Sequence, residues 1–166
     1  MALALFSIHS RKLDNMKRTF FIFGFLVLMA VVNTASAQDY KFAVGVRLSN
    51  STPTLNNSVS AKYFVTQQTA IEGLVSFGSR FGIGGLMEIH RPFKPEGFGW
   101  FYGAGAYVGF QDKNTYLGPT GIIGLDYKFP AIPLNLSLDW KPELDIIPKV
   151  AFIPDAFAVT ARFAFK

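Results

Sequence analysis

Cysteine is missing from the 166 residues of this chain. Without cysteine the protein has no disulfide framework, so its stability must come from strand pairing or from a packed core. The absence also excludes a lipoprotein, because such a protein is acylated on a cysteine at the start of its mature chain.

Long apolar segments are scarce as well. The one continuous apolar run, residues 20–32, follows the basic pair at 17–18 and precedes Ala35-Ser36-Ala37. The run is too short to span a bilayer as a helix, and a basic start, a short apolar centre and an Ala-x-Ala end are typical of a secretory signal peptide. We therefore expect the protein to be exported.

This leader divides the chain. We expect residues 16–37 to be the signal peptide, cleaved after Ala37, and residues 1–15 to be an over-extended start upstream of Met16. An unusually long basic start to the signal peptide is the alternative for residues 1–15. Residues 38–166 then form a single mature domain.

An excess of one charge is also lacking once the leader is removed. The leader holds four of the 16 basic and one of the 11 acidic residues, which leaves 12 basic and 10 acidic residues. No basic patch remains to indicate nucleic-acid binding, so we expect no nucleic-acid partner. Metal-ligand spacings, phosphate loops and nucleotide fingerprints are missing too, and we expect no cofactor and no metal.

The mature chain instead repeats one pattern. About ten residues alternate between apolar and polar, and a turn rich in Gly, Pro, Asn, Asp or Ser follows, with no helical period. An alternation of period two predicts β-strands. The clearest example is 133–144, in which Leu134, Leu136, Leu138 and Trp140 alternate with polar residues. We predict eight strands, at 40–48, 58–65, 71–77, 80–90, 99–110, 120–129, 133–144 and 157–165.

The polar face of these strands carries charged side chains. A soluble lipocalin-like barrel lines its interior with apolar residues, whereas an outer-membrane barrel encloses its charges and turns apolar residues toward lipid. The alternation alone does not identify the faces, but the leader, the aromatic content and the strand length favour lipid outside. We expect an interior charge network made of Lys41, Arg47, Lys62, Glu72, Arg80, Glu88, His90, Asp126, Lys128, Asp139, Lys141, Glu143 and Arg162.

Aromatic residues gather near the ends of the apolar face, as they do at membrane interfaces. The alternative is that aromatic residues are simply good strand formers. One predicted belt contains Tyr40, Tyr63, Trp100, Tyr127, Phe129 and Phe165, and the other contains Phe77, Phe81, Phe110, Trp140 and Phe157.

Together these patterns predict an all-β fold, an eight-stranded antiparallel up-and-down transmembrane β-barrel over residues 38–166. The chain resembles the small eight-stranded outer-membrane barrels of Gram-negative bacteria, the OmpA and OmpX-like class, and most of all its "outer membrane protein beta-barrel domain" group. The runs Lys62-Tyr63-Phe64 and 134–142 carry this resemblance. It implies a place in the bacterial outer membrane, and insertion by the barrel-assembly machinery through the aromatic C-terminal strand at 161–165.

The expected function is a structural or interaction role without catalysis. Side chains fill the lumen of an eight-stranded barrel, so we expect a plugged interior, no wide pore, outer-membrane lipid as the partner, and a monomer. With both termini periplasmic, the outward loops are short, at 49–56, 78–79, 112–116 and 145–155.

Two other functions remain open. A soluble periplasmic lipocalin-like barrel that binds a ligand would show the same alternation. A lipid A-modifying barrel enzyme needs a nucleophile with a base, but the mature chain has one histidine, His90. The residues Arg91 and Pro92 follow it, so the chain lacks the His-x-Ser run that a lipid A deacylase would show. We therefore expect that the protein is not an enzyme.

Overall fold

The computed structural model describes residues 40–50, 54–154 and 156–165. The predicted over-extended start and signal peptide, residues 1–37, lie outside these described residues. In the described ranges every regular element is a β-strand. None of their residues forms a helix that is long and apolar enough to cross a membrane.

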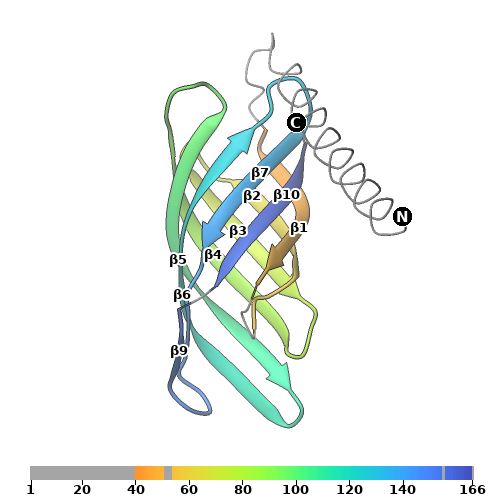
Figure 1. The fold of residues 1–166 in the computed structure, drawn as a ribbon, viewed down its shortest axis with the longest axis vertical. Helices are drawn as coiled ribbons and strands as arrows, with labels where there is room; N and C mark the ends of the chain where they lie inside the picture. The colour runs from red at the N-terminus through yellow and green to blue at the C-terminus, as the bar shows by residue number, and fades with distance from the viewer. Residues whose placement is uncertain (1–39, 51–53, 155, 166) are drawn as a thin grey trace, which may run out of the picture. The chain divides into compact units, whose positions relative to one another are not determined.

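Ten strands form one antiparallel sheet (Figure 1). Their bounds are β1 (Phe42–Ser49), β2 (Ser58–Phe64), β3 (Thr69–Ser76), β4 (Phe81–Pro92), β5 (Phe98–Gln111), β6 (Asn114–Lys128), β7 (Leu134–Trp140), β8 (Glu143–Asp145), β9 (Ala151–Ile153) and β10 (Phe157–Phe165).

The sheet closes on itself. Neighbouring strands pair from β1 to β6, β6 pairs with β7, β7 pairs with β10, and β10 pairs with β1. The ring β1-β2-β3-β4-β5-β6-β7-β10 therefore has eight strands, and the prediction of an eight-stranded closed antiparallel barrel is confirmed. The seam between the first and the last strand runs from Phe42 opposite Phe165 to Ser49 opposite Ala158.

The predicted seventh strand is not continuous. It breaks at Lys141–Pro142, where proline offers no amide proton to the ladder, and β8 continues along β6 in the same register. The segment 145–155 was expected to be a loop, but it contains β9, which pairs with β8. Prolines at 148 and 154 interrupt the alternation there, so the sequence pattern does not predict this strand. The β8–β9 hairpin and the tip of the β5–β6 hairpin project beyond the barrel at the end opposite the C-terminus (Figure 1).

Burial follows the predicted alternation along the barrel strands. In β4, residues from Phe81 to Glu88 are exposed and buried in strict turn. Exposed positions of the barrel strands carry apolar, small or aromatic side chains, with a few polar residues near strand ends and Arg91 as the one charged exception among the described residues. The polar and charged side chains point inward, where a buried apolar cluster of Leu55, Leu74, Leu86, Phe101, Tyr107 and Ile122 fills the remaining space.

Part of the connection between β1 and β2 lies inside the barrel. We expected residues 49–56 to point outward, but Thr54 and Leu55 are both 0% exposed. The Leu55 amide donates a hydrogen bond to Glu143 Oε1 at 2.9 Å, and the Leu55 carbonyl accepts one from Arg47 at 3.0 Å. The Thr54 hydroxyl accepts a hydrogen bond from Arg80 at 2.6 Å. Buried backbone groups need partners, and inward charges supply them here. We call Thr54–Leu55 the plug.

Three inward glycines make room for the plug. A Cβ atom at Gly84 would lie 2.6 Å from Leu55 Cδ1, and Cβ atoms at Gly82 and Gly109 would lie 2.9 and 2.6 Å from Thr54 Cγ2. These distances are shorter than van der Waals contact, so a side chain at any of the three positions would displace the plug. A narrow barrel thus uses small inner residues where a loop fills its lumen.

Gly84→Val tests this packing. We expect it to lower the free energy of unfolding by about 1–3 kcal/mol, because the added methyl groups overfill the interior. Gly85→Val is the matched control, since a Cβ at Gly85 meets nothing within 4 Å. Urea titration followed by tryptophan fluorescence measures both variants, and an equal loss at the two positions would show that the plug is not packed as described.

Candidate functional site

The barrel interior holds basic and acidic side chains in equal numbers. Among the described residues, five cationic and five anionic side chains are buried. Burying an ion costs several kcal/mol unless it is paired, so these groups have to lie beside one another. The ten are Arg47, Lys62, Arg80, Lys141 and Arg162, with Glu72, Glu88, Asp139, Glu143 and Asp145.

One cluster lies in the half of the barrel near the termini. Arg162 on β10 forms an ion pair with Glu72 on β3, and its Nε donates a hydrogen bond to Ser60 Oγ at 2.7 Å. Lys62 on β2 lies between two carboxylates, with its Nζ 2.6 Å from Glu88 and 3.5 Å from Glu72. Two cations therefore neutralise two carboxylates from neighbouring strands, which would repel each other without them.

His90 lies next to this cluster. Its Nε2 is 2.9 Å from Glu88 Oε2, and its Nδ1 is 3.8 Å from Asp126 Oδ1. The ring stacks on Phe101 with centroids 5.0 Å apart and contacts Phe64 at 4.9 Å. Both ring nitrogens thus face carboxylates, and the ring faces are covered by aromatic side chains.

A second cluster lies toward the plug. Arg47 on β1 pairs with Asp139 on β7 at 2.6 Å, and Lys141 pairs with Glu143 at 2.9 Å. Because Glu143 also accepts the Leu55 amide, the ion pairs and the plug are parts of one hydrogen-bond network.

A third group contains a carboxylate, Asp145, that the sequence analysis missed. Asp145 on β8 lies 3.2 Å from Arg80 and accepts a hydrogen bond from the Tyr107 hydroxyl at 2.8 Å. The Arg80 guanidinium also lies over the Tyr116 ring, 3.3 Å from its centroid. We had placed Asp145 in an outward loop. Its position two residues after Glu143, on the same face of a strand, is the signal that indicates an inward carboxylate.

The structure places the predicted network residues in three environments. Ten of the thirteen are buried in the barrel interior: Arg47, Lys62, Glu72, Arg80, Glu88, His90, Asp139, Lys141, Glu143 and Arg162. Asp126 and Lys128 are half-buried near the end of β6. Lys41 is exposed, so its expected interior position is wrong. It precedes β1, and the alternation of a strand does not apply before the strand begins.

Most of the predicted belt residues point outward. Cross-strand pairing joins Phe81 to Phe110 and Phe157 to Trp140 at the plug end. The outward and exposed members are Tyr63, Phe77, Phe81, Trp100, Phe110, Trp140, Phe157 and Phe165, and Tyr127 is half-buried.

Two predicted belt residues and several unpredicted ones change this picture. Phe129 is buried and Tyr40 is half-buried at the barrel end, so neither belongs to the outward belt. Both lie outside strands, after β6 and before β1, where the backbone turns and the alternation ends. The predicted belts also left out other outward aromatic residues near this end of the barrel: Phe42, Phe93, Phe98, Tyr102 and Phe163.

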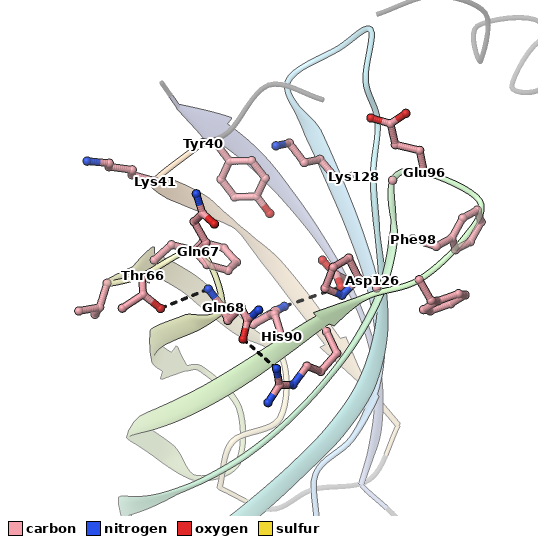
Figure 2. A pocket seen from close by; sticks show the side chains of 17 residues that line it. Tyr40, Lys41, Thr66, Gln67, Gln68, His90, Glu96, Phe98, Asp126 and Lys128 are labelled. Atoms are coloured by element: carbon pink, nitrogen blue, oxygen red, sulfur yellow. Dashed lines mark hydrogen bonds and ion pairs between the residues drawn. The ribbon is translucent and has the colours of Figure 1, made fainter. Parts of the chain in front are cut away.

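The end of the barrel near the termini is hollow (Figure 2). The cavity has a volume of about 700 Å³. It is lined by the two residues before β1, the β2–β3 turn, the ends of β4 and β6, the β4–β5 turn and the start of β5. His90 and Asp126 lie at its inner side. The ion pairs of Lys62 fill the barrel beyond His90, so the cavity is a recess and not the mouth of a wide channel.

Comparisons with known proteins identify no family for this chain. None of the protein-family models compared with the sequence matches it, and no curated protein matches it. In residues 40–50, 54–154 and 156–165, no group of three or more His, Cys, Asp or Glu side chains is arranged to hold a metal ion.

A double-mutant cycle on Arg47 and Asp139 tests the network. Arg47→Met should lower the free energy of unfolding by about 3–5 kcal/mol, because it leaves the Asp139 carboxylate buried and unpaired. Adding Asp139→Leu should recover part of that loss, with a coupling of about 1–3 kcal/mol in urea titrations. Arg91→Met is the control, since Arg91 is exposed, and its effect should stay within about 0.5 kcal/mol. Strictly additive losses at Arg47 and Asp139 would contradict the pairing.

Proposed function

We propose that this protein is a non-enzymatic β-barrel of the outer membrane of a Gram-negative bacterium, with a structural or interaction role and no wide pore. One observation carries the proposal. The barrel encloses five cationic and five anionic side chains, while its exposed strand positions carry a single charged residue, Arg91, among the residues that are described.

The exterior suits hydrocarbon better than water. Val46 and Val59 lie opposite each other on β1 and β2 and are 56% and 46% exposed, and Leu138 and Val159 face each other in the same way on β7 and β10. Soluble proteins rarely expose apolar surface that is continuous around a domain. A lipid-facing barrel requires it, because charges on the outer wall cost free energy in the bilayer.

The height of the apolar wall supports the same proposal. The nine residues of β10 cover about 26 Å along the strand, and a strand tilt of about 40° reduces this to about 20 Å across a membrane. Phe165 and Phe157 stand outward at its two ends. Their rings extend the apolar wall toward the ~25 Å height of the apolar band in outer-membrane barrels.

The lumen supports the absence of a wide pore. The plug, the ion pairs and the apolar cluster occupy the interior between the cavity and the plug end. Eight strands enclose a space that side chains fill, and here a loop adds to that filling.

The surroundings of His90 support the absence of catalysis on lipid A. A hydrolase or acyltransferase needs a hydroxyl nucleophile within hydrogen-bond reach of its base. The polar partners of His90 are the carboxylates of Glu88 and Asp126, and within the described part of the chain no hydroxyl group is hydrogen-bonded to it. A role in the charge network accounts for this residue.

The alternative is a soluble lipocalin-like barrel, in which the positions of apolar and charged side chains are exchanged. Such a barrel has an apolar interior that holds the ligand and a charged exterior. Here the buried ions line the interior, so the membrane location is the better explanation of the same fold.

The proposal extends to assembly. The last strand, β10, presents Phe163 and Phe165 outward and closes the barrel against β1. These features support insertion as a monomer by the barrel-assembly machinery, which would engage this C-terminal strand before closure.

Val46→Arg tests the membrane location. Val46 lies opposite Ala161, near the middle of the outer wall, and an arginine there should cost about 2–4 kcal/mol of unfolding free energy in phospholipid bilayers. Val46→Ala separates the charge from the loss of the valine. Val150→Arg is the depth control, because Val150 lies beyond the barrel and is 75% exposed.

Two measurements check this expectation. Urea titration in liposomes gives the free energies, and the gel shift of boiled against unboiled samples reports folding. Release of the wild-type protein from cells without detergent, or a Val46→Arg variant as stable as Val150→Arg, would contradict the membrane location.

A further inference from the structure

We propose that the cavity near the termini binds an uncharged saccharide. Its hydroxyl groups form hydrogen bonds with Tyr40, Gln67 and Asp126, and its ring packs against Phe64. This ligand goes beyond the structural or interaction role proposed above and does not rest on the membrane location. The barrel end itself forms the cavity, whatever surrounds the outer wall.

The cavity has the dimensions of a ligand site. Its volume of about 700 Å³ lies within the range of about 300–1,000 Å³ that is typical of small-molecule sites. Its lining residues come from four separate stretches of the chain, which lie within 40–41, 64–68, 90–99 and 126–128. Sites of this kind combine an apolar wall with a few polar groups that orient the ligand, so the chemistry of the polar groups decides which ligand fits.

The carboxylates at the cavity already have partners or point elsewhere. Asp126 Oδ1 faces His90 Nδ1 at 3.8 Å, and Asp126 Oδ2 accepts a hydrogen bond from the Asn135 amide at 3.1 Å. The side chain of Glu96 extends away from the hollow (Figure 2). A cationic ligand would lose its hydration at the inner side of the cavity without gaining a carboxylate of its own.

The basic side chains at the cavity are engaged or directed elsewhere as well. Arg91 donates a hydrogen bond to Gln68 at 2.8 Å, and the Lys128 ammonium lies over the Tyr40 ring, 4.8 Å from its centroid. The side chain of Lys41 extends away from the hollow (Figure 2). An anionic ligand would therefore meet no cation that is both unengaged and directed inward among the described lining residues, and an uncharged ligand fits better.

Tyr40 supplies a hydrogen-bond donor to such a ligand. Its hydroxyl points into the cavity (Figure 2), and within the described residues it has no hydrogen-bond partner. Burial raises the pKa of the Tyr40 phenol above its ordinary value, and the nearby Asp126 carboxylate adds to this shift. The phenol therefore keeps its proton at neutral pH and can donate it to an uncharged oxygen. The same surroundings disfavour an anionic oxygen at this place.

Acceptor groups share the cavity with this donor. A carboxylate offers about four lone-pair sites, so Asp126 can accept further hydrogen bonds. A Cβ at Gly99, on the cavity wall, would lie 2.9 Å from Asp126 Oδ1, so glycine leaves this oxygen uncovered. The Gln67 carboxamide, which donates and accepts, also lines the cavity and has no partner in the described part of the chain. Donors and acceptors in one small space match hydroxyl groups, which act as both.

Aromatic rings stand beside these polar groups. The rings of Tyr40 and Phe64 meet edge to face with centroids 5.6 Å apart, and both line the cavity. A sugar ring has an apolar C–H face as well as hydroxyl groups, so it can satisfy the apolar wall and the polar groups together. An apolar compound would leave the polar groups unpaired, and an open-chain polyol would lose more conformational freedom on binding.

Neutral and charged sugars of the same shape test the inference. Methyl β-pyranosides of glucose, galactose and N-acetylglucosamine are titrated into isotope-labelled protein in phosphatidylcholine nanodiscs, or in buffer if the protein is released without detergent. Amide chemical shifts of Gln67, His90 and Gly99 are followed by NMR. We expect saturable shifts with at least one of the three sugars. The 6-carboxylate and 6-ammonium derivatives of that sugar should bind at least about threefold more weakly.

Variants locate the bound sugar. Tyr40→Phe should weaken binding about three- to tenfold, because it removes the donor. Tyr63→Phe is the matched control, since the Tyr63 side chain is exposed on the outer wall, and it should bind like the wild type. Gly99→Ala should weaken binding about two- to fivefold by covering Asp126 Oδ1, whereas Gly85→Ala should not. An amide spectrum like that of the wild type verifies that each variant is folded.

Three results would overturn the inference: no saturable shift at those amides with any of the three sugars at tens of millimolar, a charged derivative that binds as tightly as its neutral parent, or equal effects of Tyr40→Phe and Tyr63→Phe. The membrane proposal is tested by Val46→Arg alone, so the two can fail separately.

Discussion

The enclosure of ionised side chains in a narrow closed ring is the constraint on which this structure depends. Each buried cation needs a carboxylate within reach, and the partner often lies on a strand that is not its neighbour. Arg162 on β10 reaches Glu72 on β3, and Arg47 on β1 reaches Asp139 on β7. Such pairs join strands that are separated by one or two others in the ring. The inward glycines follow from this, because long side chains and a loop share the same small space.

The sequence predicts the strands, and which side chains point inward, better than it predicts which of the inward side chains pair with one another. Alternation of period two is local, so the inward positions of Glu72 and Arg162 could be read from it. Which carboxylate Arg162 meets depends on ring closure between residues 90 positions apart, and no local pattern contains that. The plug escaped prediction for a related reason. Thr54 and Leu55 are buried by charges and glycines from distant strands, while their own sequence is typical of a turn.

The two ends of the barrel differ because their connections differ. At the plug end Thr54 and Leu55 lie inside the barrel and form hydrogen bonds with Arg47, Arg80 and Glu143. At the other end the connections are turns that stay at the rim, and a cavity remains above His90. The failure of alternation at Tyr40, Lys41 and Phe129 belongs to this end. Outside the strands, the backbone of the turn sets the direction of each side chain. A residue that the alternation would assign to one face can therefore lie on the other.

The barrel must close for its buried charges to pair. The ion pairs Arg47–Asp139 and Arg162–Glu72 both span the seam between β1 and β10, since each joins strands on opposite sides of it. In an open sheet these four groups would lack their partners. An open sheet is costly in a bilayer, because water cannot solvate a charged side chain that has lost its partner. Under the proposed membrane location, partly closed barrels are therefore disfavoured by their charges as well as by their unpaired edges, and the interior network makes folding more cooperative than strand pairing alone would.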